Sequence, residues 1–273
     1  MKTQSVDNGN RVLRDFDRTD NYQVNFQASY ARDFGKHSVS AMFAMEKREM
    51  NYEFSRILKE GPLNGDLANG ETNTATGSVS SSSQTARSES GDLSYIGRVN
   101  YAYDGRYLFE FLIRSDASTK FSPDNYWGVF PSVSGAWRIS EENFWKNSKL
   151  MNVVNSLKLR VGYGVTGNNA IGSSKYTTNY SQTTYPMGNN ENNSAYVVGT
   201  TLGNKDLKWE TLHATNIGLD ISLFNSRVNL TAEWYNNQIS DLLMNCVIPS
   251  STGYSSQYQN VGEMRNRGWE ITL

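Results

Sequence analysis

A strict alternation of apolar and polar residues over Asn216–Leu243 limits what this chain can fold into more than any other feature. Every second residue from Ile217 to Leu223 is apolar, and the pattern restarts from Val228 to Trp234 after Asn225-Ser226. Successive side chains of a β-strand point to opposite faces, so these runs predict a β-hairpin with one apolar and one polar face. Either a protein core or something else must cover the apolar face.

The same alternation recurs along the chain and predicts an all-β protein. Asp104-Gly105 is a strong two-residue hairpin signal between two such segments. We expect about nine antiparallel strands in an up-and-down meander, and one short helix near Glu141–Lys146 capped by Ser140. The other alternating segments are Asn21–Ala31, His37–Phe54, Leu93–Tyr103, Arg106–Ser115, Gly128–Ile139, Ser156–Val165 and a last strand from near Val261.

The links between these strands alternate between short and long. In a meander, this places every tight turn at one end of the sheet and every long loop at the other, as in outer-membrane barrels. A compact soluble domain rarely holds long loops without structure. The tight turns are Asp33–Lys36, Asp104-Gly105 and Asn225-Ser226, with the middling link Ser140–Asn155 on their side. The long polar loops are Ile57–Asp92, Asp116–Trp127, Thr166–Asp206 and Asn245–Asn260.

Strand length and composition are compatible with a membrane barrel. Several runs alternate for about ten residues, whereas soluble strands average roughly five or six and tilted membrane strands need about nine to eleven. Only 37% of the 273 residues are hydrophobic, but half of each barrel strand faces a watery lumen. No apolar run reaches the roughly 18 residues of a membrane helix. Aromatic residues near strand ends predict an interfacial girdle, with cross-strand packing as the alternative: Tyr103, Tyr107, Trp137, Trp209, Trp234 and Trp269.

Several classes of function have little support in the sequence. The net charge is −1 without a basic stripe, so we expect no nucleic-acid partner. Two histidines and the single Cys246 make a metal site or a disulfide framework improbable. Gly162–Gly167 satisfies GxGxxG, but no helix pattern follows to hold a dinucleotide. We expect no catalytic constellation and no cofactor, and therefore not an enzyme.

Two groups of side chains are candidates for contact with a solute. The first consists of charges on the polar faces, which suit the lumen of a barrel or, alternatively, the solvated face of a soluble sheet: Arg98, Glu110, Arg114, Arg160, Glu210, Asp220 and Glu233. The second consists of loop aromatics, which would contact a ligand or a lid, or simply hold the loops together: Tyr126, Trp127, Tyr176, Tyr180, Tyr185, Tyr196, Tyr254 and Tyr258.

Four sequence blocks follow one another from residue 94 to residue 273: SYIGRVNYAYDGRYLFEFLIRSDASTKFSPDNYWGVFPSVSGAWRISEENFW, LKLRVGYGVTGN, NKDLKWETLHATNIGLDISLFNSRVNLTAEWYNNQISDLL and IPSSTGYSSQYQNVGEMRNRGWEITL. Their content and order resemble the C-terminal barrel half of SusC/RagA-type TonB-linked outer-membrane proteins. The resemblance begins near Leu93, and the Ser-rich segment Gly77–Gly91 differs most.

The resemblance implies a 22-stranded barrel in the outer membrane of a Gram-negative bacterium, closed by an N-terminal plug. It also implies energy supplied by TonB with ExbB and ExbD, and import of glycans or peptides together with a SusD-like surface lipoprotein. On this basis we expect contact with outer-membrane lipid. The sequence does not identify the cargo.

We expect residues 1–273 to be a fragment of such a barrel domain. The sequence shows no plug, TonB box, signal peptide or closing C-terminal strand, and about nine strands cannot close a barrel of this family. Alone, the fragment should form a strongly curved open sheet. Arginine at Leu219 should cost roughly 2–4 kcal/mol if lipid covers the apolar face, whereas arginine at Asp220 should be tolerated. The alternative, favoured by the Tyr-rich polar loops, is a soluble glycan-binding or adhesive β-domain.

Overall fold

The computed structural model describes residues 2–5, 11–60, 78–79, 84–186 and 192–273, and most of these residues form β-strands. It divides into two compact units. The first comprises Met1–Val24 and Lys47–Gly91, and the second comprises Asn25–Glu46 and Asp92–Leu273. Among the described residues, no helix is both long enough and apolar enough to cross a membrane.

One open sheet contains the nine long strands, and their spatial order follows the sequence. This order confirms the predicted meander. The strands are β2 (Arg11–Phe34), β3 (His37–Glu60), β5 (Gln84–Tyr103), β6 (Tyr107–Ser118), β7 (Trp127–Arg138), β8 (Val154–Asn168), β12 (Glu210–Leu223), β13 (Val228–Ser240) and β16 (Glu263–Thr272). Two short strands, β1 (Lys2–Ser5) and β4 (Ser78–Val79), pair with β2 and β3 respectively.

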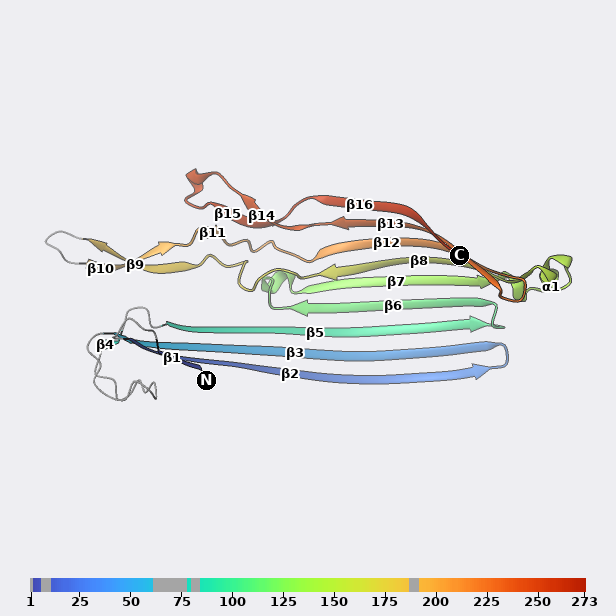
Figure 1. Ribbon diagram of the computed structural model, residues 1–273, viewed down its shortest axis with the longest axis horizontal. Coiled ribbons are helices and arrows are strands. Elements are labelled where there is room, and N and C mark those ends of the chain that lie inside the picture. The colour runs from blue at the N-terminus through green and yellow to red at the C-terminus, as the bar shows by residue number, and fades with distance from the viewer. Residues whose placement is uncertain (1, 6–10, 61–77, 80–83, 187–191) are drawn as a thin grey trace. The chain divides into compact units, whose positions relative to one another are not determined.

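The loops contain smaller elements. β9 (Tyr180–Pro186) pairs with β10 (Asn192–Val198), and β15 (Ser256–Asn260) lies between β11 (Thr201–Leu202) and β14 (Leu243–Val247). Single turns of 3-10 helix occur at Pro123–Asn125, Ile139–Glu141, Lys149–Asn152 and Ser250–Thr252. In the second unit, the long links lie at the left end of Figure 1 and the tight turns and α1 (Asn143–Lys146) at the right, as the alternation of link lengths predicts.

The tight turns form where the sequence predicts them. Asp104 and Gly105 have φ values of 52° and 63°, the left-handed backbone that a two-residue hairpin of this type requires. Gly35, with φ 61°, supplies the same conformation between β2 and β3. The turn at Asn225-Ser226 is longer than expected, because the bend covers four residues from Phe224 to Arg227.

Three predicted boundaries are wrong. β2 begins at Arg11 instead of the predicted Asn21. α1 begins at Asn143 with Glu142 at its N-cap, whereas Ser140 lies buried in the preceding 3-10 turn. The loop predicted at Ile57–Asp92 is in part an extension of β3 and β5, and residues 61–77 and 80–83 lie outside the described residues. The strand extensions carry polar residues on both faces, so backbone pairing continues where the apolar alternation has ended.

The apolar face of the second unit covers no core among the described residues. One row of paired residues crosses seven strands on this face: Tyr101, Phe109, Gly135, Val161, Ile217, Trp234 and Trp269. Within this row, Phe109, Val161 and Ile217 are 57%, 47% and 42% exposed. The buried apolar cluster of Phe121, Ile171 and Leu207 instead lies among the long loops. An exposed apolar face that crosses seven strands indicates a contact with lipid or with another protein.

Aromatic rings stack near both ends of this apolar face. At the tight-turn end, Tyr107 lies 6.3 Å from both the Tyr103 and the Trp137 ring. At the loop end, Tyr95 stacks 5.9 Å from Trp127. These two rows have the composition of interfacial girdles. Trp209 does not belong to either of them. Its ring is 5.3 Å from the Phe121 ring in the loop core. The prediction that Trp209 belongs to an interfacial girdle is therefore wrong.

Glu142 joins the tight-turn ends of β6 and β7 and the turn between β5 and β6 through a single carboxylate. Its Oε1 accepts hydrogen bonds from the Tyr107 hydroxyl at 2.6 Å and from Trp137 Nε1 at 3.1 Å. Its Oε2 accepts a hydrogen bond from Arg106 Nη1 at 3.1 Å. These donors, with the Tyr107 hydroxyl contributing most, hold the pKa of Glu142 below its usual range. The ionised carboxylate therefore stabilises the fold.

The lowered pKa of Glu142 predicts a pH-dependent stability. Above the ordinary carboxylate pKa the stabilisation is complete, and it is lost as the pH falls through the lowered value. Glu142→Gln should therefore destabilise the lipid-reconstituted protein at pH 7, and the difference from wild type should vanish at low pH. Urea unfolding of both proteins across this pH range measures the difference in unfolding free energy. Asp124→Asn, in an exposed loop, is the control. A difference that does not change with pH would contradict the assignment.

The exposure of the apolar face predicts opposite responses to arginine at neighbouring positions of β12. Leu219→Arg should reduce the unfolding free energy of the lipid-reconstituted protein by roughly 2–4 kcal/mol, because it places a charge near mid-bilayer. Ser222→Arg, on the other face, should have a much smaller effect. Urea unfolding in lipid vesicles compares the two variants. Equal losses would contradict the assignment of faces.

Candidate functional site

The charged residues predicted to line a lumen share the face opposite the aromatic rows. The strand pairings place them at positions that alternate with the apolar residues: Arg98, Glu110, Arg114, Arg160, Glu210, Asp220 and Glu233. Their local environments differ, however: three of them form a central network, and two make contacts near the loop end.

Arg160 is the centre of a charge network across β8, β12 and β13. Its Nε donates to Asp220 Oδ2 at 2.8 Å and its Nη2 to Asp220 Oδ1 at 3.1 Å, a bidentate pair. The same Nη2 lies 3.6 Å from Glu233 Oε2. Asn216 Nδ2 donates to Glu233 Oε1 at 2.9 Å, and the Thr231 hydroxyl donates to Asp220 at 3.3 Å. One guanidinium thus links two carboxylates that come from different strands.

Gly218 provides the space that this network needs. It pairs with Arg160 on one side and with Glu233 on the other. A Cβ at Gly218 would lie 2.8 Å from Arg160 Nη2, so any side chain there would displace the guanidinium. Sequence reasoning did not identify this residue. The available signal is a glycine within an otherwise unbroken alternating strand, which often marks a close approach.

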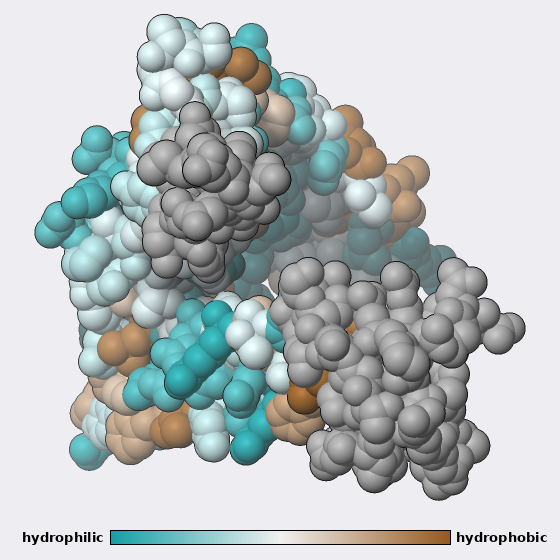
Figure 2. All heavy atoms as spheres, turned by 90° about the vertical axis from the view of Figure 1, so that its left-hand side faces the viewer, coloured by the Kyte–Doolittle hydropathy of each residue, from teal (hydrophilic) through white to brown (hydrophobic). Residues whose placement is uncertain are grey.

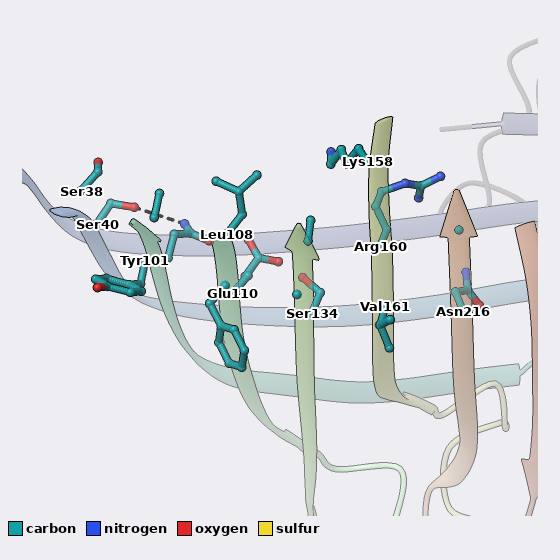
Figure 3. Close-up of a pocket in the computed structure, with 17 residues that line it drawn as sticks. Ser38, Ser40, Tyr101, Leu108, Glu110, Ser134, Lys158, Arg160, Val161 and Asn216 are labelled. Carbon is teal, nitrogen blue, oxygen red and sulfur yellow. Dashed lines mark hydrogen bonds between the residues drawn. The ribbon is translucent and has the colours of Figure 1, made fainter. Parts of the chain in front are cut away.

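A depression of about 470 Å³ lies beside the network, on the same face (Figure 3). Glu110 on β6 and Lys158 and Arg160 on β8 bring charges of both signs to it. The rest of the lining includes apolar side chains such as Leu108 and Phe109, and also hydroxyl and amide groups. Among these is Ser40, whose Oγ accepts a 3.2 Å hydrogen bond from Asn100. Val161 points to the opposite side from Arg160. This surface can hydrogen-bond a polar solute and pair with either sign of charge.

Two of the predicted lumen residues are instead engaged near the loops. Arg114 Nε is 2.7 Å and 2.9 Å from the two oxygens of Asp116, which is only 8% exposed. Glu210 accepts a hydrogen bond from Asn168 at 2.9 Å and another from the backbone N–H of Leu243 at 3.1 Å. The Arg114 contact lies within β6, near its loop end, whereas the Glu210 contact with Leu243 connects the start of β12 to the long link after β13. Sequence alternation assigns the correct face to both residues but does not reveal these partners.

The loop aromatics occupy several environments. Tyr126 and Tyr258 pack against the loop core of Phe121, Ile171 and Leu207, and Trp127 lies on the apolar face against Tyr95. A solute contact therefore stays a prediction for Tyr180, which is 66% exposed, and for the partly buried Tyr176 and Tyr254. The side chains of Tyr185 and Tyr196 lie outside the described residues.

Figure 2 views the molecule from the end that carries the long loops of the second unit. The described residues seen there are mostly hydrophilic, and hydrophobic residues appear in small groups. This composition contrasts with the exposed apolar residues at mid-strand, such as Phe109, Val133 and Val161. The loop end is therefore suited to water, whereas the middle of the apolar face is not.

The charge network predicts a measurable coupling between Arg160 and Asp220. Both side chains are about one-third exposed, so we expect a double-mutant cycle with Arg160→Met and Asp220→Asn to give about 1 kcal/mol, reduced at high salt. A cycle that combines Lys149→Met with Asp220→Asn is the control and should give a coupling near zero. No coupling in the first cycle would contradict the observed geometry.

Comparison with known proteins gives a consistent result. The family profile described as "TonB dependent receptor-like, beta-barrel" matches residues 2–273. A TonB-dependent receptor of Formosa agariphila is 32% identical over 270 residues, which are 97% of this chain and 26% of that protein. The TonB-dependent receptor SusC of Bacteroides thetaiotaomicron is 38% identical over 187 residues, which are 66% of this chain and 18% of SusC.

Among solved structures, the RagAB peptide transporter superposes with a TM-score of 0.77 and 27% sequence identity. The match covers 96% of this chain and 28% of the transporter chain. The matched segments therefore make up between 18% and 28% of the length of these three proteins.

Proposed function

Because this chain belongs to the TonB-dependent receptor β-barrel family, of the SusC/RagA type, we propose that it forms part of the wall of an outer-membrane nutrient importer. The observation that carries the proposal is the pair of faces in the second unit. One face exposes large apolar side chains at mid-strand, and the other carries the Arg160 network and the depression beside it. A membrane barrel requires such a division.

The same observation disfavours a soluble glycan-binding or adhesive domain. In water, such a domain would have to cover the apolar face, and none of the described residues does so. The aromatic rows at both ends of the face also match two membrane interfaces better than one continuous core. The loop tyrosines alone favour the soluble alternative, and two of those that are described, Tyr126 and Tyr258, pack against the loop core.

The proposed cargo is a glycan or peptide fragment that passes beside the polar face. Glu110, Lys158 and Arg160 could pair with peptide termini or acidic sugars, and the amides and hydroxyls with neutral sugars. We further propose that a SusD-like surface lipoprotein covers the loop end, and that TonB with ExbB and ExbD supplies the energy. Support for these partners comes from the membership of the SusC/RagA type and from the hydrophilic loop end.

Uptake by the full-length receptor tests the proposal. A deletion strain should fail to accumulate one of two labelled pools, oligosaccharides or peptides, and the intact gene should restore accumulation only when TonB is present. Lys158→Gln should slow this uptake several-fold if cargo passes the depression, because it removes one cation from the lining. Lys149→Gln, near the tight turns, is the matched control. Unchanged accumulation of both pools in the deletion strain would contradict import.

A further inference from the structure

The apolar face of β12, β13 and β16 becomes polar before these strands end. Trp234 pairs with Ile217 and with Trp269, and this is the last apolar row toward the long loops. The next three rows on the same face join β13 to β16 through Asn236 with Arg267, Gln238 with Arg265, and Ser240 with Glu263. We call these six residues the polar ladder.

The position of the polar ladder corresponds to the water side of a lipid boundary. Two residues advance a strand by roughly 7 Å, so the change from tryptophan to arginine takes place within one row. Tryptophan collects at membrane interfaces, and Trp269 is 72% exposed on this face. On β7, the apolar run continues farther toward the loops as far as Trp127, as expected for strands that tilt across a bilayer.

The polar ladder carries a surplus of positive charge. Arg265 and Arg267 both have exposed side chains and lie two residues apart on the same side of β16. Arg265 Nε donates to Asn236 Oδ1 at 2.6 Å, which orients its guanidinium. The single carboxylate of the ladder, Glu263, accepts a hydrogen bond from the Gln238 amide. On β12, His213 pairs with Gln238, and its Nδ1 contacts the Tyr163 hydroxyl at 2.9 Å.

We propose that the polar ladder binds the phosphate-bearing headgroups of outer-leaflet lipid. A guanidinium matches the geometry of phosphate with paired hydrogen bonds, and two of them project from the ladder. The amides of Asn236 and Gln238 add neutral hydrogen-bonding groups. The ladder is continuous with the lipid-facing residues Trp234 and Trp269, so a lipid whose chains lie on the apolar face has its headgroup at this height. The inference rests on the proposed placement of the sheet in a membrane.

Lipid retention by the full-length receptor tests this inference. The receptor is reconstituted with outer-membrane glycolipid from its host, either intact or stripped of phosphate, and the bound glycolipid is measured after delipidation. Wild type should retain the phosphorylated form, and the double variant Arg265→Gln/Arg267→Gln should retain roughly tenfold less. Lys149→Gln/Lys205→Gln removes the same charge elsewhere and should retain as much as wild type.

The possible outcomes separate the two proposals. If the receptor folds into lipid but the arginine variant retains as much glycolipid as wild type, the headgroup site is wrong and the membrane placement stands. The headgroup site is also wrong, and the membrane placement also stands, if both forms of glycolipid bind equally or if the variant instead loses a protein partner. If the receptor does not partition into lipid at all, the proposed function itself fails.

Discussion

The register of the cross-strand hydrogen bonds determines which residues this sheet presents to lipid and which to the interior. Side chains alternate with a period of two, so a slip of one residue would exchange the faces of a whole strand. In β12 such a slip would place Asp220 where Leu219 now lies, among Leu159 and Ala232. A charge in lipid costs several kilocalories per mole, so the sequence itself penalises the wrong register. In a bilayer, backbone pairing is also obligatory, because lipid offers the peptide groups no hydrogen-bonding partner.

The register is fixed at both ends of the strands rather than by a central core. At the tight-turn end, Asp104-Gly105 takes the left-handed conformation, and Glu142 connects β6 and β7. Asn155 adds a second tie there, since its amide donates to Asn225 Oδ1 at 3.2 Å and its own oxygen accepts from Asn225 N–H. At the loop end, the buried cluster around Phe121 gathers three long loops. The middle of the sheet is left with one face for lipid and one for polar contacts.

Sequence alone predicts the parts of this structure that depend on periodicity. The strand order, the tight turns and the face of each charged residue from Arg98 to Glu233 all follow from alternation and link length. The extensions of β2, β3 and β5 could not be predicted, because polar residues occupy both faces there. The packing of Trp209 in the loop core could not be predicted either, since it depends on Phe121 and Phe130, distant residues on other segments. The bidentate pair of Arg160 and Asp220 also overturns the expectation that arginine would be tolerated at position 220. Arginine at Asp220 would meet Arg160 and Lys158 and should not be tolerated.

Contact between lipid and the apolar face is the claim on which the proposed functions depend. Site-directed spin labels in the reconstituted full-length receptor measure it most directly, through collision with oxygen dissolved in lipid or with a water-soluble nickel complex. We expect labels at Leu219, Leu230 and Val161 to collide mainly with oxygen. Labels at Ser222 and Thr231 should not show this excess of collisions with oxygen. If labels on both faces respond alike, or if Leu219 responds mainly to nickel, the apolar face does not contact lipid and the account is wrong.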